Sequence, residues 1–332
     1  MKKKVFMLGL AAVFSLGLAG CNDSEKASPE SKEVSQDKAG KESADVSKEK
    51  STSETQTITY LNEQYTLPSE VNKIVTASLE AMEDAAILGV KPIGAITIGG
   101  KLPAYVADEL EGAQSVGEKT QPNYETLLQM KPDVILGTSK FQADVAEQLN
   151  KVATMVPVSH VSTNWEDNLR LMAQLTGKES EADQIINDYK ADVTKVKEEL
   201  SETIKDKKIV VLRIRAGNMF VYPEGVYLNP VIYEDLGATV PEEIKAAKAQ
   251  EQMSLEKLAQ MNPDYIFLQF DESENAEKPK TLEELQNNAI WKSIEAAKNN
   301  HVFVNAVDPL AQGGTAWSKT AFIKAVEESL TK

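Results

Sequence analysis

A stretch without Gly or Pro, from Lys178 to Asp206, constrains the fold more than any other feature of the chain. Without a helix breaker, the stretch can continue as one helix over its whole length. Its apolar residues recur three or four positions apart and form one stripe: Ala182, Ile185, Ile186, Tyr189, Val193, Val196, Leu200 and Ile204. Such a helix is roughly 40 Å long. It is therefore either a coiled-coil arm or a rod that joins two domains.

A repeated motif on both sides of this helix favours the rod. Residues 123–136 read NYETLLQMKPDVIL, and residues 254–267 read SLEKLAQMNPDYIF. Each copy predicts a short helix, a Pro-Asp break and a buried parallel strand. One copy alone is a common α/β connection, but two copies with matched Glu, Leu, Gln-Met, Pro-Asp and Ile indicate two homologous lobes.

Strand and helix patterns alternate on both sides of the helix, which is typical of doubly wound sheets. We therefore predict an α/β fold with two Rossmann-like lobes, each with a parallel sheet, bridged by one long helix. The predicted boundaries are 57–178 for the N-terminal lobe, 179–206 for the helix and 207–332 for the C-terminal lobe, with a hairpin over 58–67. Ligands of such sheets bind at the carboxyl ends of the strands, so we expect a cleft between the lobes.

The first residues carry the features of a lipoprotein export signal. Lys2–Lys4 precede an apolar run to Leu18, and residues 1–20 end immediately before Cys21, the only cysteine of the chain. We predict that Cys21 is lipidated and anchors the protein at the extracellular face of the cell membrane. Residues 21–56 are rich in Ser, Lys, Glu and Asp and predict a disordered tether.

Composition excludes several classes of function. A formal net charge of −15 argues against a nucleic-acid partner. Only two histidines are present, so a bare metal site built from several His ligands is not expected. No nucleophile–base motif is recognisable, which argues against an enzyme. We expect a monomer that needs no cofactor.

Two kinds of residue are candidates for ligand contact. Arg213 and Arg215 alternate at the end of a predicted strand in a chain with only three arginines. Two guanidinium groups on one face suit an anionic, oxygen-rich ligand. Trp165 and Trp317 each sit where a loop enters a helix, where they would line a cleft or belong to the core.

From Cys21 onward, the sequence resembles the substrate-binding lipoproteins of ABC importers for iron–siderophore complexes and cobalamin. The segment 116–127, VGEKTQPNYETL, is similar to the part of ferric-hydroxamate binders where a basic residue touches iron-bound oxygens. The resemblance puts Lys119 at that place and Phe141 at a pocket-lining aromatic position. It makes Arg213 and Arg215 the arginine pair of the second lobe, and residues 308–317 are most similar to Bacillus-type hydroxamate binders.

This resemblance implies a protein that delivers a ferric siderophore to an ABC transporter permease, with the iron held by the siderophore. A ferric hydroxamate is the first expectation. A citrate-hydroxamate or catecholate siderophore, heme or cobalamin, and a lipid-anchored enzyme are the alternatives. The resemblance also implies that Glu125 and Glu256 dock onto arginines of the permease subunits. Whether Lys101, Lys140 and His301 reach the cleft stays open.

Overall fold

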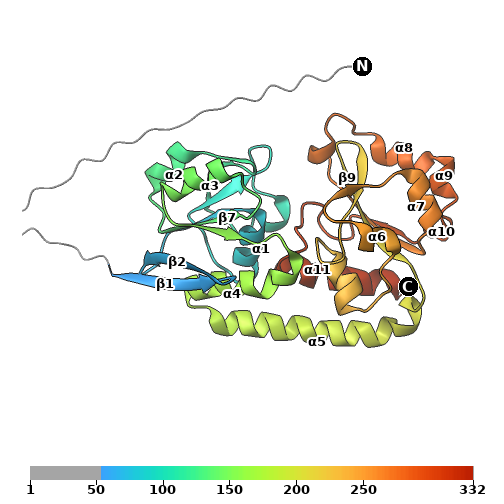
Figure 1. The fold of residues 1–332 in the computed structure, drawn as a ribbon, viewed down its shortest axis with the longest axis horizontal. Coiled ribbons are helices and arrows are strands. Elements are labelled where there is room, and N and C mark those ends of the chain that lie inside the picture. The colour runs from blue at the N-terminus through green and yellow to red at the C-terminus, as the bar shows by residue number, and fades with distance from the viewer. Residues whose placement is uncertain (1–53, 332) are drawn as a thin grey trace, which may run out of the picture. The chain divides into compact units, whose positions relative to one another are not determined.

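Two larger β-sheets, with a long helix running below both, organise residues 54–331, the part of the chain that the computed structural model describes (Figure 1). The first sheet has the strand order β6-β5-β4-β3-β7-β8 and the second the order β11-β10-β9-β12-β13. In chain order, the first sheet contains β3 (Ile74–Ala77), β4 (Gly94–Thr97), β5 (Gln114–Glu118), β6 (Gln121–Pro122), β7 (Val134–Thr138) and β8 (Met155–Val158). The second contains β9 (Ile209–Arg215), β10 (Asn218–Val221), β11 (Glu251–Gln252), β12 (Tyr265–Phe270) and β13 (Val302–Val304).

Helices cover these sheets and connect their strands. The larger ones are α1 (Leu79–Ile87), α2 (Tyr124–Met130), α3 (Ala143–Asn150), α4 (Trp165–Thr176), α5 (Glu179–Ile204), α7 (Leu255–Met261), α8 (Thr281–Asn287) and α11 (Ala316–Leu330). The shorter ones are η1 (Ala104–Val106), η2 (Ser162–Asn164), the π-helix η3 (Val231–Asp235), α6 (Glu242–Ala246), η4 (Ser273–Asn275), α9 (Ala289–Lys292) and α10 (Glu295–Lys298). The chain breaks between α8 and α9, because Asn288 has an extended backbone and begins a new helix.

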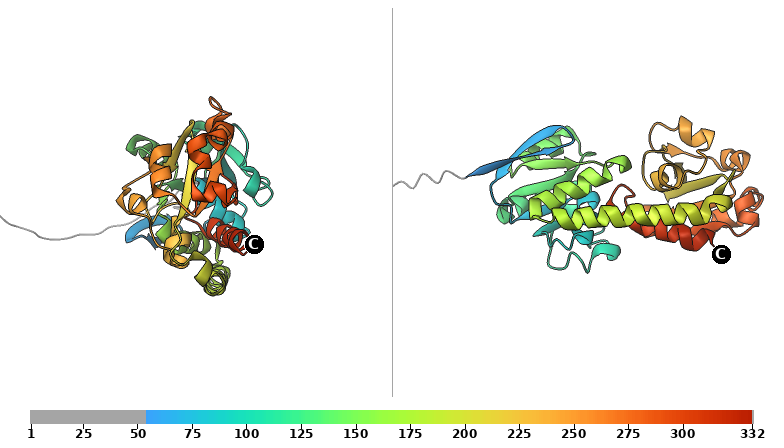
Figure 2. Two further views of the ribbon diagram at one scale, coloured as in Figure 1. Left: turned by 90° about the vertical axis from the view of Figure 1, so that its right-hand side faces the viewer. Right: turned by 90° about the horizontal axis from the view of Figure 1, so that it is seen from below.

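The predicted bridging helix is confirmed as α5, which runs below both sheets in Figure 1. Most of its apolar stripe is buried: Ala182, Ile186, Tyr189, Val196, Leu200 and Ile204. The C-terminal helix α11 packs along α5, as the right-hand view of Figure 2 shows, and it also contacts α1 and α4. A helix that we assigned to the C-terminal lobe by sequence therefore also packs against the first lobe.

The two copies of the sequence repeat on either side of the bridging helix adopt the same local structure. Asn123 and Ser254 cap the starts of α2 and α7, and both helices end on a left-handed residue. The Asp of each Pro-Asp pair then binds the residue just before a neighbouring strand of its sheet. Asp133 accepts from the main-chain N–H of Lys73, just before β3, and Asp264 accepts from that of Lys208, just before β9. The strands that follow, β7 and β12, pair in parallel with β3 and β9.

Two details differ from the sequence prediction. The sheets are mixed, because β10 pairs antiparallel with β9 and β6 pairs antiparallel with β5. The turn between β9 and β10 is a two-residue hairpin in which Ala216 and Gly217 both have positive φ. The predicted first hairpin is confirmed as β1 (Thr55–Tyr60) and β2 (Glu63–Pro68), which turn at Leu61 and Asn62.

Other predictions concern residues outside the described part of the chain. The export signal, Cys21 and nearly all of the tether over 21–56 lie there. Among residues 54–331, no helix combines the length and the apolar character needed to cross a bilayer.

Candidate functional site: a basic cleft between the two sheets

A cleft of about 300 Å³ lies between the loops at the ends of the two sheets. On the side of the first sheet it is lined by Glu80, Lys119, Lys140 and His160. On the side of the second sheet it is lined by Arg213, Arg215, Tyr222, Val226, Tyr227, Lys248, Ala249 and Gln250, and Gln312 lies on the segment that leads to α11. The volume is at the lower end of the range for small-molecule sites.

Positive charge dominates this cleft, although the whole chain is acidic. Five of its lining side chains are basic, namely Lys119, Lys140, Arg213, Arg215 and Lys248, and one, Glu80, is acidic. Burial and, next to it, the nearby charge of Arg213 lower the pKa of Lys119 to about 8. A buried lysine surrounded by other cations is stabilised in its charged form when an anion binds beside it.

The two arginines at the end of β9 are held by one carboxylate. Glu274, on η4, has Oε2 2.9 Å from Nη2 of Arg213 and 3.3 Å from Nε of Arg215. Arg213 is only 5% exposed, and its guanidinium carbon lies 5.3 Å from the centre of the Tyr227 ring. Arg215 also donates to Oε1 of Gln250 at 3.0 Å. One carboxylate cannot neutralise two guanidinium groups, so a net positive charge remains here.

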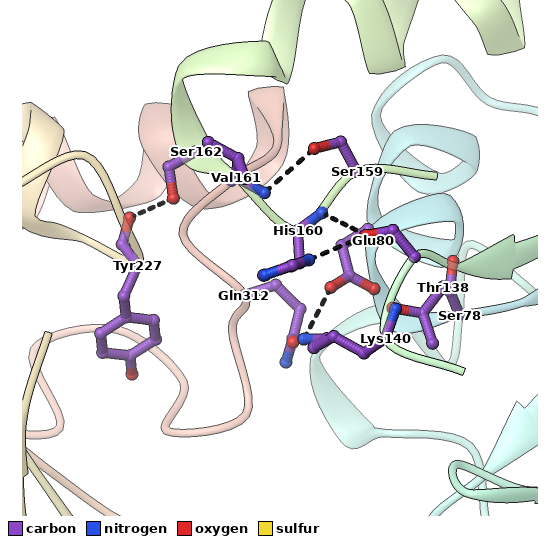
Figure 3. A network of polar contacts seen from close by, with 12 residues as sticks. Ser78, Glu80, Thr138, Lys140, Ser159, His160, Val161, Ser162, Tyr227 and Gln312 are labelled. Atoms are coloured by element: carbon purple, nitrogen blue, oxygen red, sulfur yellow. Dashed lines mark hydrogen bonds and ion pairs between the residues drawn. The ribbon is translucent and has the colours of Figure 1, made fainter. Parts of the chain in front are cut away.

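The opposite wall carries a smaller polar network, which Figure 3 shows. Lys140 follows β7, and its Nζ lies 3.1 Å from Oε1 of Glu80, a buried residue of α1. His160 follows β8, and its Nδ1 lies 2.8 Å from Oγ of Ser139. Residues in the loops after the strands therefore line the cleft, as the sequence predicts.

The segment that carries Gln312 is fixed to the first lobe by a buried carboxylate. Glu83 of α1 accepts hydrogen bonds from the main-chain N–H of Gln312 at 2.9 Å and from the hydroxyl of Tyr105 at 2.6 Å. The hydroxyls of Thr315 and Ser318 donate to its other oxygen. Glu83 thereby determines where Gln312 enters the cleft.

Of the ligand-contact residues predicted from sequence, three line the cleft: Lys119, Arg213 and Arg215. Of the undecided residues, Lys140 also lines it, whereas Lys101 is not among the lining residues. His301 lies elsewhere, stacked on the Tyr265 ring with Nδ1 3.2 Å from the carbonyl oxygen of Asp264, as expected of a structural residue.

The three predicted aromatic contacts do not line the cleft. Trp165 is buried and packs edge-on against Tyr189, with 5.1 Å between ring centres. It lines a second cavity, which side chains of α5 also line. Trp317 packs on Tyr105, with ring centres 4.7 Å apart. The ring of Phe141 lies over Gly137 and packs against the hydrophobic core. These side chains fill space between elements, so the apolar walls of the cleft come from Tyr222, Val226 and Tyr227 instead.

Sequence reasoning missed several of the lining residues. Lys248 and Gln250 lie in an Ala-rich loop, and no motif indicates which way this loop faces. Glu80 and His160 follow strands β3 and β8 closely, so the rule that ligands bind at the carboxyl ends of strands could have found them. Within residues 54–331, no group of three or more His, Cys, Asp or Glu side chains is placed to hold a metal ion.

The two glutamates expected to dock a transporter are not among the residues that line the cleft, and they lie at matching places of the repeat. Glu125 is in the first turn of α2, and Glu256 is in the first turn of α7. Both are exposed. An acidic residue in this position also stabilises its own helix through the helix dipole.

Comparison with known proteins identifies the family of this chain. The family model described as periplasmic binding protein matches residues 74–306, which include both sheets and the bridging helix. The chain belongs to the periplasmic binding protein family. This binding protein therefore belongs to a family of substrate carriers and is not an enzyme.

Individual relatives of this periplasmic binding protein handle iron. It is 51% identical over 281 residues to the iron-uptake system-binding protein of Bacillus subtilis, covering 84% of this chain and 89% of that protein. The crystal structure of the triscatecholate siderophore binding protein FeuA of the same organism, in complex with ferri-bacillibactin, superposes with a TM-score of 0.81 at 51% identity. That match covers 83% of this chain and 98% of FeuA, and confirms the predicted fold. The iron(3+)-hydroxamate-binding protein FhuD of Bacillus subtilis is 26% identical over 287 residues, 84% of this chain and 88% of FhuD.

Proposed function

We propose that this protein binds a ferric triscatecholate siderophore outside the cell and delivers it to an ABC transporter permease for iron uptake. The observation that carries the proposal is the surplus of positive charge in the cleft, where five basic lining side chains face two carboxylates, those of Glu80 and of Glu274 behind the arginines. An iron(III) ion held by three catecholates is triply anionic, because each catecholate brings two negative charges. The complex and the cleft are therefore complementary in charge.

The same argument disfavours the hydroxamate that the sequence analysis put first. An iron(III) ion held by three hydroxamates is uncharged at its centre and gains little from five cations. The relative with 51% identity has a solved complex with a triscatecholate, whereas the hydroxamate binder FhuD is 26% identical. Both observations support the catecholate alternative.

The protein is expected to contact the siderophore and not the iron. Arg213, Arg215, Lys119, Lys140 and Lys248 would donate hydrogen bonds to the catecholate oxygens, which already coordinate the metal. Tyr222 and Tyr227, whose rings are tilted to each other with centres 4.8 Å apart, would provide a wall for the catechol rings.

The experiment compares wild-type protein with two charge variants, Arg215→Gln and Lys248→Gln, by calorimetry. Both side chains lie at the cleft and are not buried, so their loss leaves the fold intact. Each substitution should weaken binding of ferri-bacillibactin about tenfold, which corresponds to about 1.4 kcal/mol. Lys257→Gln, an exposed lysine of α7 outside the lining residues, is the matched control and should change nothing. The proposal is refuted if the wild-type protein does not bind the ferric triscatecholate.

A further inference from the structure

His160 presents its ring nitrogen Nε2 to the cleft, and its other ring nitrogen, Nδ1, forms a hydrogen bond with the wall of the cleft. Nδ1 lies 2.8 Å from Oγ of Ser139, which in turn lies 3.2 Å from the main-chain nitrogen of His160 (Figure 3). Figure 3 also shows the second ring nitrogen on the side of the ring that faces Tyr227 of the second lobe. No residue within 54–331 forms a hydrogen bond with this Nε2 atom.

The two contacts of Ser139 favour one tautomer of the imidazole. A main-chain N–H can only donate, so Oγ of Ser139 accepts from His160 N–H and is free to donate its own proton to Nδ1. A neutral imidazole that accepts at Nδ1 carries its proton on Nε2. His160 therefore offers an N–H donor to the cleft without carrying a charge.

The charges that face His160 come from both walls of the cleft. On its own side are Lys140, Lys119 and the carboxylate of Glu80, and across the cleft are Arg213, Arg215 and Lys248. Burial lowers the pKa of His160, and the charge of Lys140 lowers it further, against a smaller opposing effect of Glu80. In the empty cleft the ring is therefore neutral near pH 7. A triply anionic ligand reverses the sign of the local potential and favours the protonated ring.

We propose that His160 is a specificity-determining contact, which donates Nε2–H to a catecholate oxygen and takes up a proton from solvent when the triply anionic complex enters. The inference rests on the proposed function and adds a chemical reason for choosing among siderophores. An uncharged hydroxamate complex leaves the potential at the ring unchanged and gains only the neutral hydrogen bond. A catecholate complex gains an imidazolium partner as well.

The proposal predicts that affinity for a triscatecholate rises as the pH falls through the titration range of histidine. Ligand binding raises the pKa of the ring, so the bound state holds more protons than the free state. If binding raises that pKa by one unit, affinity gains up to about tenfold from this group. The siderophore also titrates, but its contribution is the same for every variant of the protein.

The experiment measures proton uptake by calorimetry with ferri-bacillibactin, at about pH 6.5, in two buffers of different ionisation enthalpy. Two variants separate the roles of the ring. In His160→Gln the amide nitrogen reaches about as far as Nε2 but does not titrate. In His160→Asn the side chain ends near the position of Nδ1 and leaves the cleft without the donor.

We expect the wild-type protein to take up a few tenths of a proton more than either variant. His160→Gln should stay within about threefold of wild-type affinity near pH 8 and lose the rise at lower pH. His160→Asn should bind the siderophore about tenfold more weakly than wild type, both near pH 8 and at lower pH, which corresponds to about 1.4 kcal/mol. Thermal unfolding confirms that both variants are folded.

Two results overturn the inference while the proposed function stands. One is equal proton uptake by wild-type protein and His160→Gln, and the other is wild-type affinity in His160→Asn. Failure of the wild-type protein to bind the triscatecholate at all is a different result, which removes the proposed function and this inference together.

Discussion

The stability of the protein should fall as the pH rises through neutrality, because of one buried carboxyl. Glu83 is fully buried between α1 and the segment that carries Gln312. Burial raises its pKa from 4.5 to about 7, although four donors lower it. These donors are the hydroxyls of Ser318, Thr315 and Tyr105 and the main-chain N–H of Gln312.

The sign and size of the effect follow from linkage. The folded state holds the proton more tightly than the unfolded state, so the stability from this group is complete below the ordinary pKa. It is lost as the pH rises through 7. Between about pH 5 and about pH 8.5 the loss is about 2–3 kcal/mol, since each unit of pKa difference is worth about 1.4 kcal/mol. Asp84, the neighbouring residue, has a pKa raised by burial and adds to the loss.

The assay is urea unfolding of wild-type protein and Glu83→Gln at several pH values across this range. Glutamine resembles the protonated acid and cannot ionise, so the variant should lose about 2–3 kcal/mol less than wild type as the pH rises. Glu125→Gln, the same substitution at an exposed position, should keep the wild-type profile. Identical profiles for Glu83→Gln and wild type would show that the Glu83 carboxyl does not titrate in this range.

Further variants test other parts of the account. Lys319 is 2% exposed and pairs with Asp235 at 2.7 Å, so Lys319→Ala should lower the free energy of unfolding by about 3 kcal/mol; a loss under about 1 kcal/mol would count against that pair. Cys21→Ala should release the protein into the medium, and a variant that stays in the membrane fraction would contradict the lipid anchor. Glu125→Ala with Glu256→Ala should leave siderophore affinity unchanged but sharply reduce uptake by cells. Normal uptake would leave these glutamates only a helix-stabilising role.

Much of the architecture was predictable because it depends on local patterns. The stripe on α5 and the repeated Pro-Asp motif depend on spacing within a few turns of chain, and both are present in the structure. The break between α8 and α9 was not predictable, because Asn288 can either continue a helix or cap a new one. Tertiary packing decides between these two outcomes.

The site was predictable only where side chains follow strands. Arg213 and Arg215 reach the cleft because period two directs both to one face at the end of β9. Trp165 could not be placed, since its contacts with Tyr189 and Lys319 join residues far apart in the chain. Lys248 was missed for the same reason, because only the fold shows that its loop faces the cleft.

The most direct test of the account is a competition between two siderophores for one cleft. Purified protein is incubated with equal amounts of ferri-bacillibactin and an iron(III) trishydroxamate, and the bound complex is identified by its visible absorption after gel filtration. The positive cleft predicts that the triscatecholate occupies the protein at a ratio of one to one, with at least about tenfold preference, or about 1.4 kcal/mol. Recovery of the trishydroxamate in equal or greater amount would contradict the central claim that charge selects the ligand.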